Sequence, residues 1–327
     1  MALLSLLVRR LLHAAGLLVA VVCLNFALIH LAPGDPAQVI AGEMGGANAQ
    51  ILAQLRAAYH LDQSFADQLW IYLAHVARGD LGRSYYFNAP VAGLIAARVP
   101  ATLLLVGTAI VWAVAAGTLL GIAAARRPDG LVSHLITVLS LVGFSAPVFW
   151  TGILLILLFA SALPIFPVEG MHNIAELGRL GWWGGMLDVL YHLVLPATTL
   201  GLLYLAQYSR LARASMLEAL GADYVRTARA KGLPEWLVVY KHALRNAILP
   251  VVTIVGLQFS QIFSGAVLVE TVFDWPGLGR LAYDSILRRD SPTILGILLF
   301  SALIVIAVNL LTDIVYRLVD PRIRSGP

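Results

Sequence analysis

The stretch from Ser209 to Pro250 reads SRLARASMLEALGADYVRTARAKGLPEWLVVYKHALRNAILP. It is rich in Arg and Lys and lies between two apolar stretches, 189–209 and 246–269, that contain no Asp, Glu, Lys or Arg. As a helix, each stretch is long enough to cross a hydrocarbon core of roughly 30 Å, because about 20 residues suffice. The sequence therefore predicts two membrane spans joined by a large basic loop on one face.

The same pattern extends over the whole chain. Four further stretches lack those four residue types: 11–34, 99–125, 130–168 and 291–312. Charged residues make up only 12% of the sequence, against about 25% in soluble domains. Lipid leaves the backbone no hydrogen-bonding partner except its own helix. The predicted fold class is therefore all-α, a polytopic membrane helix bundle of six spans.

Local signals place some of the helix ends. Pro100 is expected at the start of the second span, and Pro147 predicts a kink in the third. Ser291 and Pro292 suit the N-cap and first position of the last helix. The first stretch is longer than the apolar part of a signal peptide, and no clean small-x-small cleavage site follows it, so we expect a retained anchor.

The distribution of basic residues predicts the orientation. With the N-terminus inside, 14 of the 22 Lys and Arg residues fall on inside segments and the other 8 outside. Short cytoplasmic loops carry an excess of Lys and Arg, so both termini are expected in the cytoplasm. The chain then divides into residues 1–34 (N-terminus and first span), 35–98 (a small helical extracytoplasmic segment) and 99–327 (a five-span core with the cytoplasmic loop 210–245).

The loop 210–245 has a helix–turn–helix pattern. Residues 211–221 can continue the fourth span, and a short helix is predicted from Tyr224 to Lys231. Gly232 suits a C-terminal cap, and Pro234 can open a helix over 234–246. The loop also has more apolar residues than a loop facing only water needs, which suggests a docking surface; they are Tyr224, Val225, Leu233, Trp236, Leu237, Val238 and Val239. The alternative is a solvated basic loop that contacts anionic lipid.

These residues resemble a known family. The segments Tyr224–Gly232 (YVRTARAKG) and His242–Pro250 (HALRNAILP) are similar to the cytoplasmic coupling motif of the dipeptide/oligopeptide permease family of ABC importers. Where other importers open this motif with Glu-Ala-Ala, this chain has Arg226-Thr227-Ala228. Further matches, in the family's order, are Arg9-Arg10, Pro33-Gly-Asp-Pro-Ala37, Gly79-Asp-Leu-Gly82, Phe273-Asp-Trp-Pro-Gly-Leu-Gly-Arg280 and Asp320-Pro-Arg-Ile-Arg324.

The resemblance covers nearly the whole chain and is closest to the first of the family's two paired permease subunits. It implies the ABC importer permease fold in a bacterial plasma (inner) membrane. It also implies three kinds of protein partner: a second homologous permease subunit, two ABC ATPase subunits, and an extracytoplasmic substrate-binding protein. The ATPase-coupling residues that it implies are Tyr224, Arg226, Thr227, Ala228, Arg229, Lys231, Gly232, His242, Leu244 and Arg245.

Several site types find no support in the sequence. A phosphate-binding P-loop needs Gly-Lys-Ser/Thr, but Lys231 is followed by Gly232 and Lys241 by His242. We therefore expect no bound cofactor and no catalytic residue, with ATP hydrolysed by partner subunits. Cys23 is the only cysteine and the eight histidines are scattered, so no metal site is expected. The basic residues lie in short loops, which argues against nucleic-acid binding; contact with membrane lipid is expected.

Two other classes of membrane protein fit the sequence less well. An intramembrane hydrolase would need Gly-x-Ser-x-Gly, but the segment from Gly143 through Ser145 to Pro147 lacks the last glycine. An ion-driven secondary carrier usually places ionisable residues near the bilayer midplane. The predicted spans here hold Glu270 and Asp313 only near their ends, which favours energy supplied from outside the membrane.

Two further sets of residues are candidates for roles in transport. In the fifth span, Gln258, Gln261, Ser264 and Gly265 are candidates to line the translocation path; the alternative is a packed helix interface. Glu270, Asp274 and Trp275 are candidates to face the binding protein, with a plain structural turn as the alternative. The substrate expected first is a dipeptide or oligopeptide, with glutathione, a nickel or metal chelate, or an opine as alternatives.

Overall fold

A computed structural model describes residues 2–31, 37–38, 41, 48–58, 61–173, 175, 179 and 181–319. Within these residues the protein is helical and has no strand beyond an isolated bridge between Arg83 and Pro90. In chain order the helices are α1 (Ala2–Leu31), α3 (Ala49–Ala58), α4 (Phe65–Ala77), α5 (Val91–Arg126), α6 (Leu131–Ser145), α7 (Val148–Leu155), the π-helix η1 (Ile156–Ala162), α8 (Trp182–Gly221), α9 (Asp223–Ala230), α10 (Glu235–Leu237), the π-helix η2 (Val238–Ala243), α11 (Leu244–Ala247), α12 (Leu249–Val272), α13 (Leu278–Leu287) and α14 (Ser291–Val319). The all-α prediction is confirmed for this part of the chain.

Several of these helices are suited to a membrane. Three are long and apolar enough to cross one: α5, α8 and residues Ser291–Leu310 of α14. A fourth is added if Glu235–Ala247 and Leu249–Val255, which meet at a bend of 44°, form one span. Shorter apolar helices, Ala15–Leu28 and Val148–Ala162, lie in the predicted first and third spans. The described residues thus support a helical membrane protein, and the number of six spans stays a prediction.

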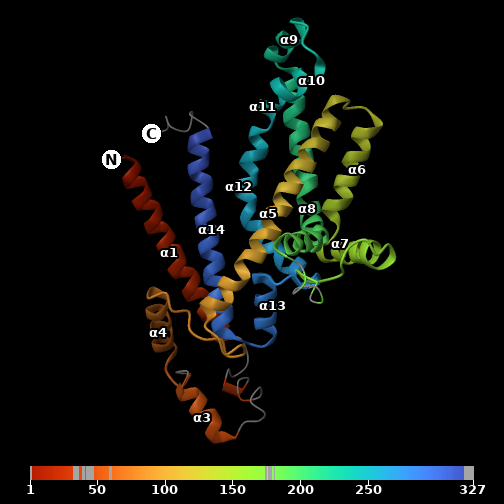
Figure 1. The fold of residues 1–327 in the computed structure, drawn as a ribbon. Coiled ribbons are helices and arrows are strands. Elements are labelled where there is room, and N and C mark those ends of the chain that lie inside the picture. Colours follow the sequence, from red (N-terminus) through yellow and green to blue (C-terminus); the bar gives the residue numbers. More distant parts are fainter. Residues whose placement is uncertain are drawn as a thin grey trace. The chain divides into compact units, whose positions relative to one another are not determined.

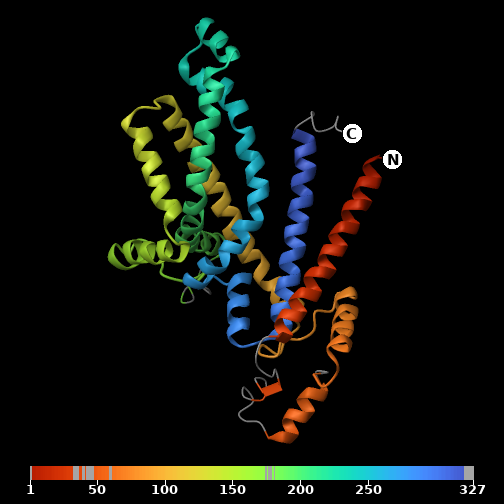
Figure 2. The same ribbon diagram turned by 180° about the vertical axis from the view of Figure 1, so that it is seen from behind.

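The chain folds into two compact units. Unit 1 comprises Met1–Pro100 and Gly277–Ala307, and unit 2 comprises Ala101–Pro276 and Val308–Pro327. This division follows packing, whereas the predicted boundaries at residues 34 and 98 follow the expected membrane topology and stay a prediction. In unit 2, α8 is the central helix, because α6, α7 and α12 all pack against it (Figures 1 and 2).

In unit 1, the helical segment after the first span packs on that span. Ser64 caps α4, since its Oγ accepts a hydrogen bond from the backbone N of Asp67. The Phe26 ring of α1 stacks on the ring of Tyr72 from α4, with centroids 5.7 Å apart. The prediction of helices within residues 35–98 is therefore confirmed for α3 and α4. The resembling segment Pro33–Pro36 lies outside the described residues.

A buried carboxylate fixes the start of α14. Asp290 is fully buried and its side chain accepts hydrogen bonds from Ser84 Oγ, the backbone N of Tyr85 and Thr293 Oγ1. Its backbone carbonyl accepts the first bond of the helix, from Ile294 N at 3.0 Å. The N-cap is therefore Asp290, and the prediction of Ser291 is wrong by one residue. Three donors offset the cost of burying the carboxylate.

In unit 2, glycines allow α5 and α8 to cross closely. A Cβ atom on Gly121 would lie 2.6 Å from Ala212 Cβ, and one on Gly117 would lie 2.8 Å from Tyr208 Cβ. Both distances are shorter than any normal carbon contact, so neither position has room for a larger side chain. Pairs of small residues four apart are typical of closely packed membrane helices. Gly117 and Gly121 are therefore packing residues of the α5–α8 crossing.

The prolines act differently from the prediction at two positions. Pro100 lies inside α5, which begins nine residues earlier at Val91, so it does not start the helix. At Pro147 the chain does more than kink: α6 ends at Ser145, Ala146 is extended with ψ 133°, and α7 starts at Val148. Proline disfavours the helical conformation of the residue before it, which accounts for the break. The stretch 130–168 is therefore two helical segments (Figure 1).

Candidate functional site

The predicted helix–turn–helix of the basic loop is present in unit 2. α8 continues to Gly221, α9 covers Asp223–Ala230, and a new helix begins at Glu235 with Pro234 as its N-cap. We call residues 210–247 the coupling segment. Figures 1 and 2 place α9 and α10 at one end of unit 2, beyond the end of α8.

Gly232 makes the turn between the two helices. Its φ is +75°, a conformation that residues with a Cβ rarely adopt. Gly232 N donates to Arg229 O at 2.9 Å, and Leu233 N donates to Ala228 O at 3.4 Å. These two bonds form the Schellman motif, in which the residues after the helix satisfy its last free carbonyls. The prediction that Gly232 caps this helix is confirmed.

An ion pair closes the same turn. Arg229 on α9 donates from Nη2 to Glu235 Oε1 at 2.8 Å and from Nε to Glu235 Oε2 at 3.2 Å. This bidentate geometry is the strongest that arginine makes with a carboxylate. The hydrogen bond from Arg229 lowers the pKa of the Glu235 carboxyl group, and the positive charge of Arg229 lowers it further. The pair is largely exposed, so its contribution to stability is small.

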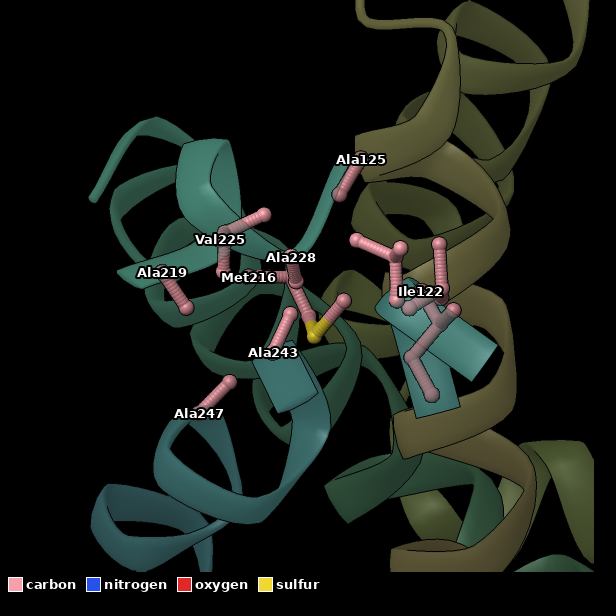
Figure 3. Close-up of a cluster of buried hydrophobic side chains, with 10 residues drawn as sticks. Ile122, Ala125, Met216, Ala219, Val225, Ala228, Ala243 and Ala247 are labelled. Atoms are coloured by element: carbon pink, nitrogen blue, oxygen red, sulfur yellow. The ribbon is translucent and has the colours of Figure 1, made fainter. Parts of the chain in front are cut away.

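A cluster of buried apolar side chains seats the coupling segment on the rest of unit 2. Its members come from α5, α8, α9, η2 and α11, and they are Ile122, Ala125, Met216, Ala219, Val225, Ala228, Val238, Val239, Ala243 and Ala247. Figure 3 shows side chains of these elements meeting around Met216. Leu233, next to the turn, packs against the same cluster. The segment is therefore a packed projection of the helix bundle and differs from a solvated loop.

Three large aromatic side chains of the coupling segment are exposed. Trp236 is 64% exposed, Tyr240 46% and Tyr224 41%. The predicted docking surface is thus corrected in part: Tyr224 and Trp236 are available to a partner, whereas Val225, Val238 and Val239 are buried in the cluster. Tyr240 was missed, although its spacing of four residues from Trp236 is the spacing of neighbours on a helix face.

Most of the other predicted coupling residues are exposed as well. Exposed members are Arg226, Thr227, Arg229, Lys231, Gly232 and Arg245, while His242 and Leu244 are partly buried and Ala228 is buried. Thr227 Oγ1 donates to the carbonyl of Asp223 at 2.9 Å, so its hydroxyl group is used within α9. The exposed surface of the coupling segment therefore combines aromatic rings with Arg and Lys side chains. Aromatic residues and Arg are enriched at protein interfaces, whereas Lys is not.

The candidates for the translocation path divide. Gln258 on α12 is only 6% exposed, and its Oε1 atom is buried without a hydrogen-bond partner. A Cβ on Gly265 would lie 3.6 Å from Leu200 Cδ1 and 3.7 Å from Tyr204 Oη, at normal contact distance from α8. Both residues thus lie in a packed helix interface in this structure. The side chains of Gln261 and Ser264 lie outside the described part, so a role in lining the path stays a prediction.

The candidates to face a binding protein lie at the end of α12. Glu270 and Trp275 are both 0% exposed; Glu270 accepts a hydrogen bond from Thr102 Oγ1 at 2.6 Å, and Trp275 Nε1 donates to Ala101 O at 2.8 Å. Neither side chain is accessible to a partner in this structure. The prediction that Glu270 and Trp275 contact the binding protein directly is therefore corrected. Asp274 is partly exposed and holds the turn with a φ of +52°. Thr102, the partner of Glu270, carried no sequence signal.

The described residues contain no group of three or more His, Cys, Asp or Glu side chains that could hold a metal ion. Two histidines lie near the Asp188 carboxylate: the Nδ1 atoms of His172 and His192 are 3.6 and 3.2 Å from it. Asp188 also accepts a hydrogen bond from the backbone N of Asn173 at 2.9 Å. This cluster holds the loop before α8 to that helix.

Comparison with known proteins places this geometry in a family. Residues 117–325 match the family described as the binding-protein-dependent transport system inner membrane component, and residues 3–106 match the N-terminal part of such membrane components. The dipeptide transport system permease protein DppB of Escherichia coli K12 is 40% identical, over 98% of this chain and 99% of its own length. The di/tripeptide transport system permease protein DppB of Pseudomonas aeruginosa is 41% identical, over 98% of this chain and 99% of its own length.

A relative with a different named solute is equally similar. The glutathione transport system permease protein GsiC of Salmonella paratyphi A is 41% identical, over 97% of each chain. The resemblance that the motifs indicated is confirmed by these matches, which cover both the coupling segment and the end of α12. The chain belongs to the family of binding-protein-dependent transport system inner membrane components, as a permease subunit.

Proposed function

We propose that this subunit forms half of the translocation pathway of an ABC importer for dipeptides or oligopeptides. The observation that carries the proposal is the coupling segment: a projection with a buried apolar base, a defined turn at Gly232 and an exposed face that includes Trp236 and Tyr240. A projection of this kind suits a partner that must push on the helix bundle, because its packed base can pass force to α5 and α8.

The proposed assembly contains four kinds of component. This chain pairs with a second homologous permease subunit, two ABC ATPase subunits dock on the two coupling segments, and an extracytoplasmic binding protein delivers the solute. ATP is bound and hydrolysed by the ATPase subunits, consistent with the absence of a P-loop around Lys231 and Lys241. The family description, which names a binding-protein-dependent system, supports this composition.

The proposed topology has six retained spans with both termini in the cytoplasm of a bacterium. Reporter fusions after Pro327 and within 210–245 should report the inside, and fusions within 40–90 the outside. A C-terminal reporter on the outer side would contradict this arrangement. The excess of Lys and Arg on the segments assigned to the inside supports it.

Dipeptides are the first choice of solute because two of the relatives described above are named for dipeptide or di/tripeptide transport. Glutathione, itself a small peptide, is the second, favoured by the equally similar glutathione permease. Metal chelates and opines remain alternatives from the family resemblance alone.

The deciding experiment uses the complete complex in lipid vesicles. With its binding protein and ATP supplied, the complex should import labelled alanyl-alanine, and an ionophore that collapses ion gradients should leave import unchanged. Import that depends on an ion gradient but not on ATP would favour the ion-driven carrier and refute the proposal. Glutathione, tested in the same vesicles, distinguishes the two solute classes.

A further inference from the structure

The end of α12 far from the coupling segment carries a buried acidic side chain. Glu270 is the only Asp, Glu, Lys or Arg residue in α12, and it is 0% exposed. Thr102 on α5, which is 1% exposed, donates a hydrogen bond from Oγ1 to Glu270 Oε1 at 2.6 Å. Burying a carboxyl group is costly unless it is hydrogen-bonded, so separating Glu270 from its position beside α5 carries a penalty.

A second hydrogen bond joins the same two segments. The indole Nε1 of Trp275 donates to the carbonyl of Ala101, the neighbour of Thr102, at 2.8 Å. The backbone N of Trp275 donates to the carbonyl of Glu270 at 2.9 Å and closes the turn after α12. Two adjacent residues of α5 thus hold both the last turn of α12 and the residues that follow it. We call Ala101, Thr102, Glu270 and Trp275 the α12 anchor.

The opposite end of α12 continues directly into the coupling segment. Only Ile248 separates α11 from α12, and the axes of Glu235–Ala247 and Leu249–Val255 meet at 44°. With 24 residues, α12 is about 36 Å long. All these residues belong to unit 2, so α12 links the coupling segment, across the bend at Ile248, to a buried, hydrogen-bonded contact at its other end.

We propose that the α12 anchor is the fixed point about which α12 tilts when the coupling segment is displaced, and that Thr102 and Trp275 are positioning residues of the transport cycle. The inference rests on the proposed function. A rigid helix held at one end converts a push at the other into a change of tilt, which moves the residues between them. If the hydrogen bonds of the α12 anchor are lost, the same displacement of the coupling segment moves α12 as a whole and does not tilt it.

This mechanism explains why an acidic residue occupies a buried position where an apolar one would pack at lower cost. Ionisable residues within membrane helices are rare and mark functional positions by default, and Glu270 is a fully buried acidic residue in the last turn of such a helix. The hydrogen bond to Glu270 is directional, so it constrains the rotation of α12 in addition to the constraint from apolar packing. The function assigned to the anchor is therefore orientation of α12 and not contact with solute.

The test compares two substitutions at Thr102 in the complete complex in vesicles, with alanyl-alanine as the probe. Thr102→Val has almost the same shape but no donor, whereas Thr102→Ser keeps the hydroxyl group. The measured quantity is the number of peptides imported per ATP hydrolysed. Thr102→Val should lower this ratio by about fivefold or more, the effect of removing one hydrogen bond to a buried carboxyl group. Thr102→Ser should stay close to the unaltered protein.

A second variant and a second measurement separate the anchor from general stability. Trp275→Phe keeps an aromatic ring but removes the indole donor, and it should lower the same ratio while ATPase subunits still co-purify. A merely structural contact would reduce the amount of inserted complex or its melting temperature and leave the ratio unchanged; that result in both variants would overturn the proposal. Absence of peptide import by the unaltered complex would refute the proposed function itself, and the anchor's role with it.

Discussion

Gly232→Val places a β-branched side chain at a position where the backbone has a φ of +75°. Apart from the two chain neighbours, no residue has an atom within 4 Å of the Cβ that the substitution adds, so this Cβ meets open space. The cost is conformational: a non-glycine residue in the left-handed region is less stable by about 1–2 kcal/mol. A penalty of that size lowers the ratio of intact to disrupted turns by a factor of about 5–30.

The disruption should stay local. The turn depends on the two Schellman bonds and on the Arg229–Glu235 pair, whereas α5, α8 and α12 are held by other contacts. Gly232→Val should therefore insert at a near-normal level. We expect transport per inserted complex to fall severely, with either loss of the ATPase subunits on purification or loss of the stimulation of ATP hydrolysis by the loaded binding protein.

Gly221→Val is the matched control. Gly221 ends α8 eleven positions before Gly232, has equally open space around a Cβ, and does not have a positive φ. The two variants add the same side chain to the same segment, so any difference between them reports the backbone conformation at Gly232. Gly232→Asn should be intermediate, because asparagine tolerates the left-handed region better than valine. Equal transport by Gly232→Val and Gly221→Val would refute the reasoning.

Three more outcomes are expected. Trp236→Ala removes a side chain that is 64% exposed, so the melting temperature of the isolated subunit should not change. Binding of the ATPase subunits should weaken by about tenfold or more, as it does when an aromatic interface residue is lost. Unchanged binding would exclude Trp236 from the interface. Gly121→Val must push α8 away, since even its Cβ would lie 2.6 Å from Ala212 Cβ; a destabilisation of about 1–3 kcal/mol is expected, visible as a lower melting temperature, and a normal melting temperature would contradict the close crossing. The pKa of Glu235 is lowered in the folded protein, so the stabilisation from its pair with Arg229 is complete above the ordinary carboxyl pKa of 4.5 and is lost as the pH falls through the lowered value. The melting temperature of Glu235→Gln should accordingly lie slightly below that of the unaltered protein at neutral pH, and the difference should vanish in acid; a difference that persists there would contradict the pair.

Local chemistry made much of the coupling segment predictable. Gly232, Pro234 and the run of helix-forming residues after Asp223 each act within a few residues of themselves, so the caps and the turn could be predicted from the sequence. Whether a given apolar residue of the segment is buried or exposed could not be predicted, because this depends on the positions of α5 and α8. Val225 and Trp236 carry similar sequence signals, yet one is buried against those helices and the other is exposed.

The same limit applies at the end of α12. The chain turns after α12, at Phe273 and Asp274, but an acidic residue next to a loop is typical of an exposed position. Nothing in the sequence pairs Glu270 with Thr102, 168 positions away. Likewise, Pro147 indicated a disturbed helix, while the full break depends on Ala146 adopting an extended conformation. A contact between distant segments decides the burial of Glu270, and the hydropathy pattern does not show such contacts.

The buried base of the coupling segment has a consequence for mapping by mutation. Five of the ten residues in that cluster are already alanine: Ala125, Ala219, Ala228, Ala243 and Ala247. An alanine scan would therefore pass over half of this contact and report it as unimportant. Only a larger residue, for example valine or leucine, can probe these alanine contacts, because small side chains there allow the helices to pack closely. At these five positions, sensitivity to mutation should rise with the volume that a substitution adds.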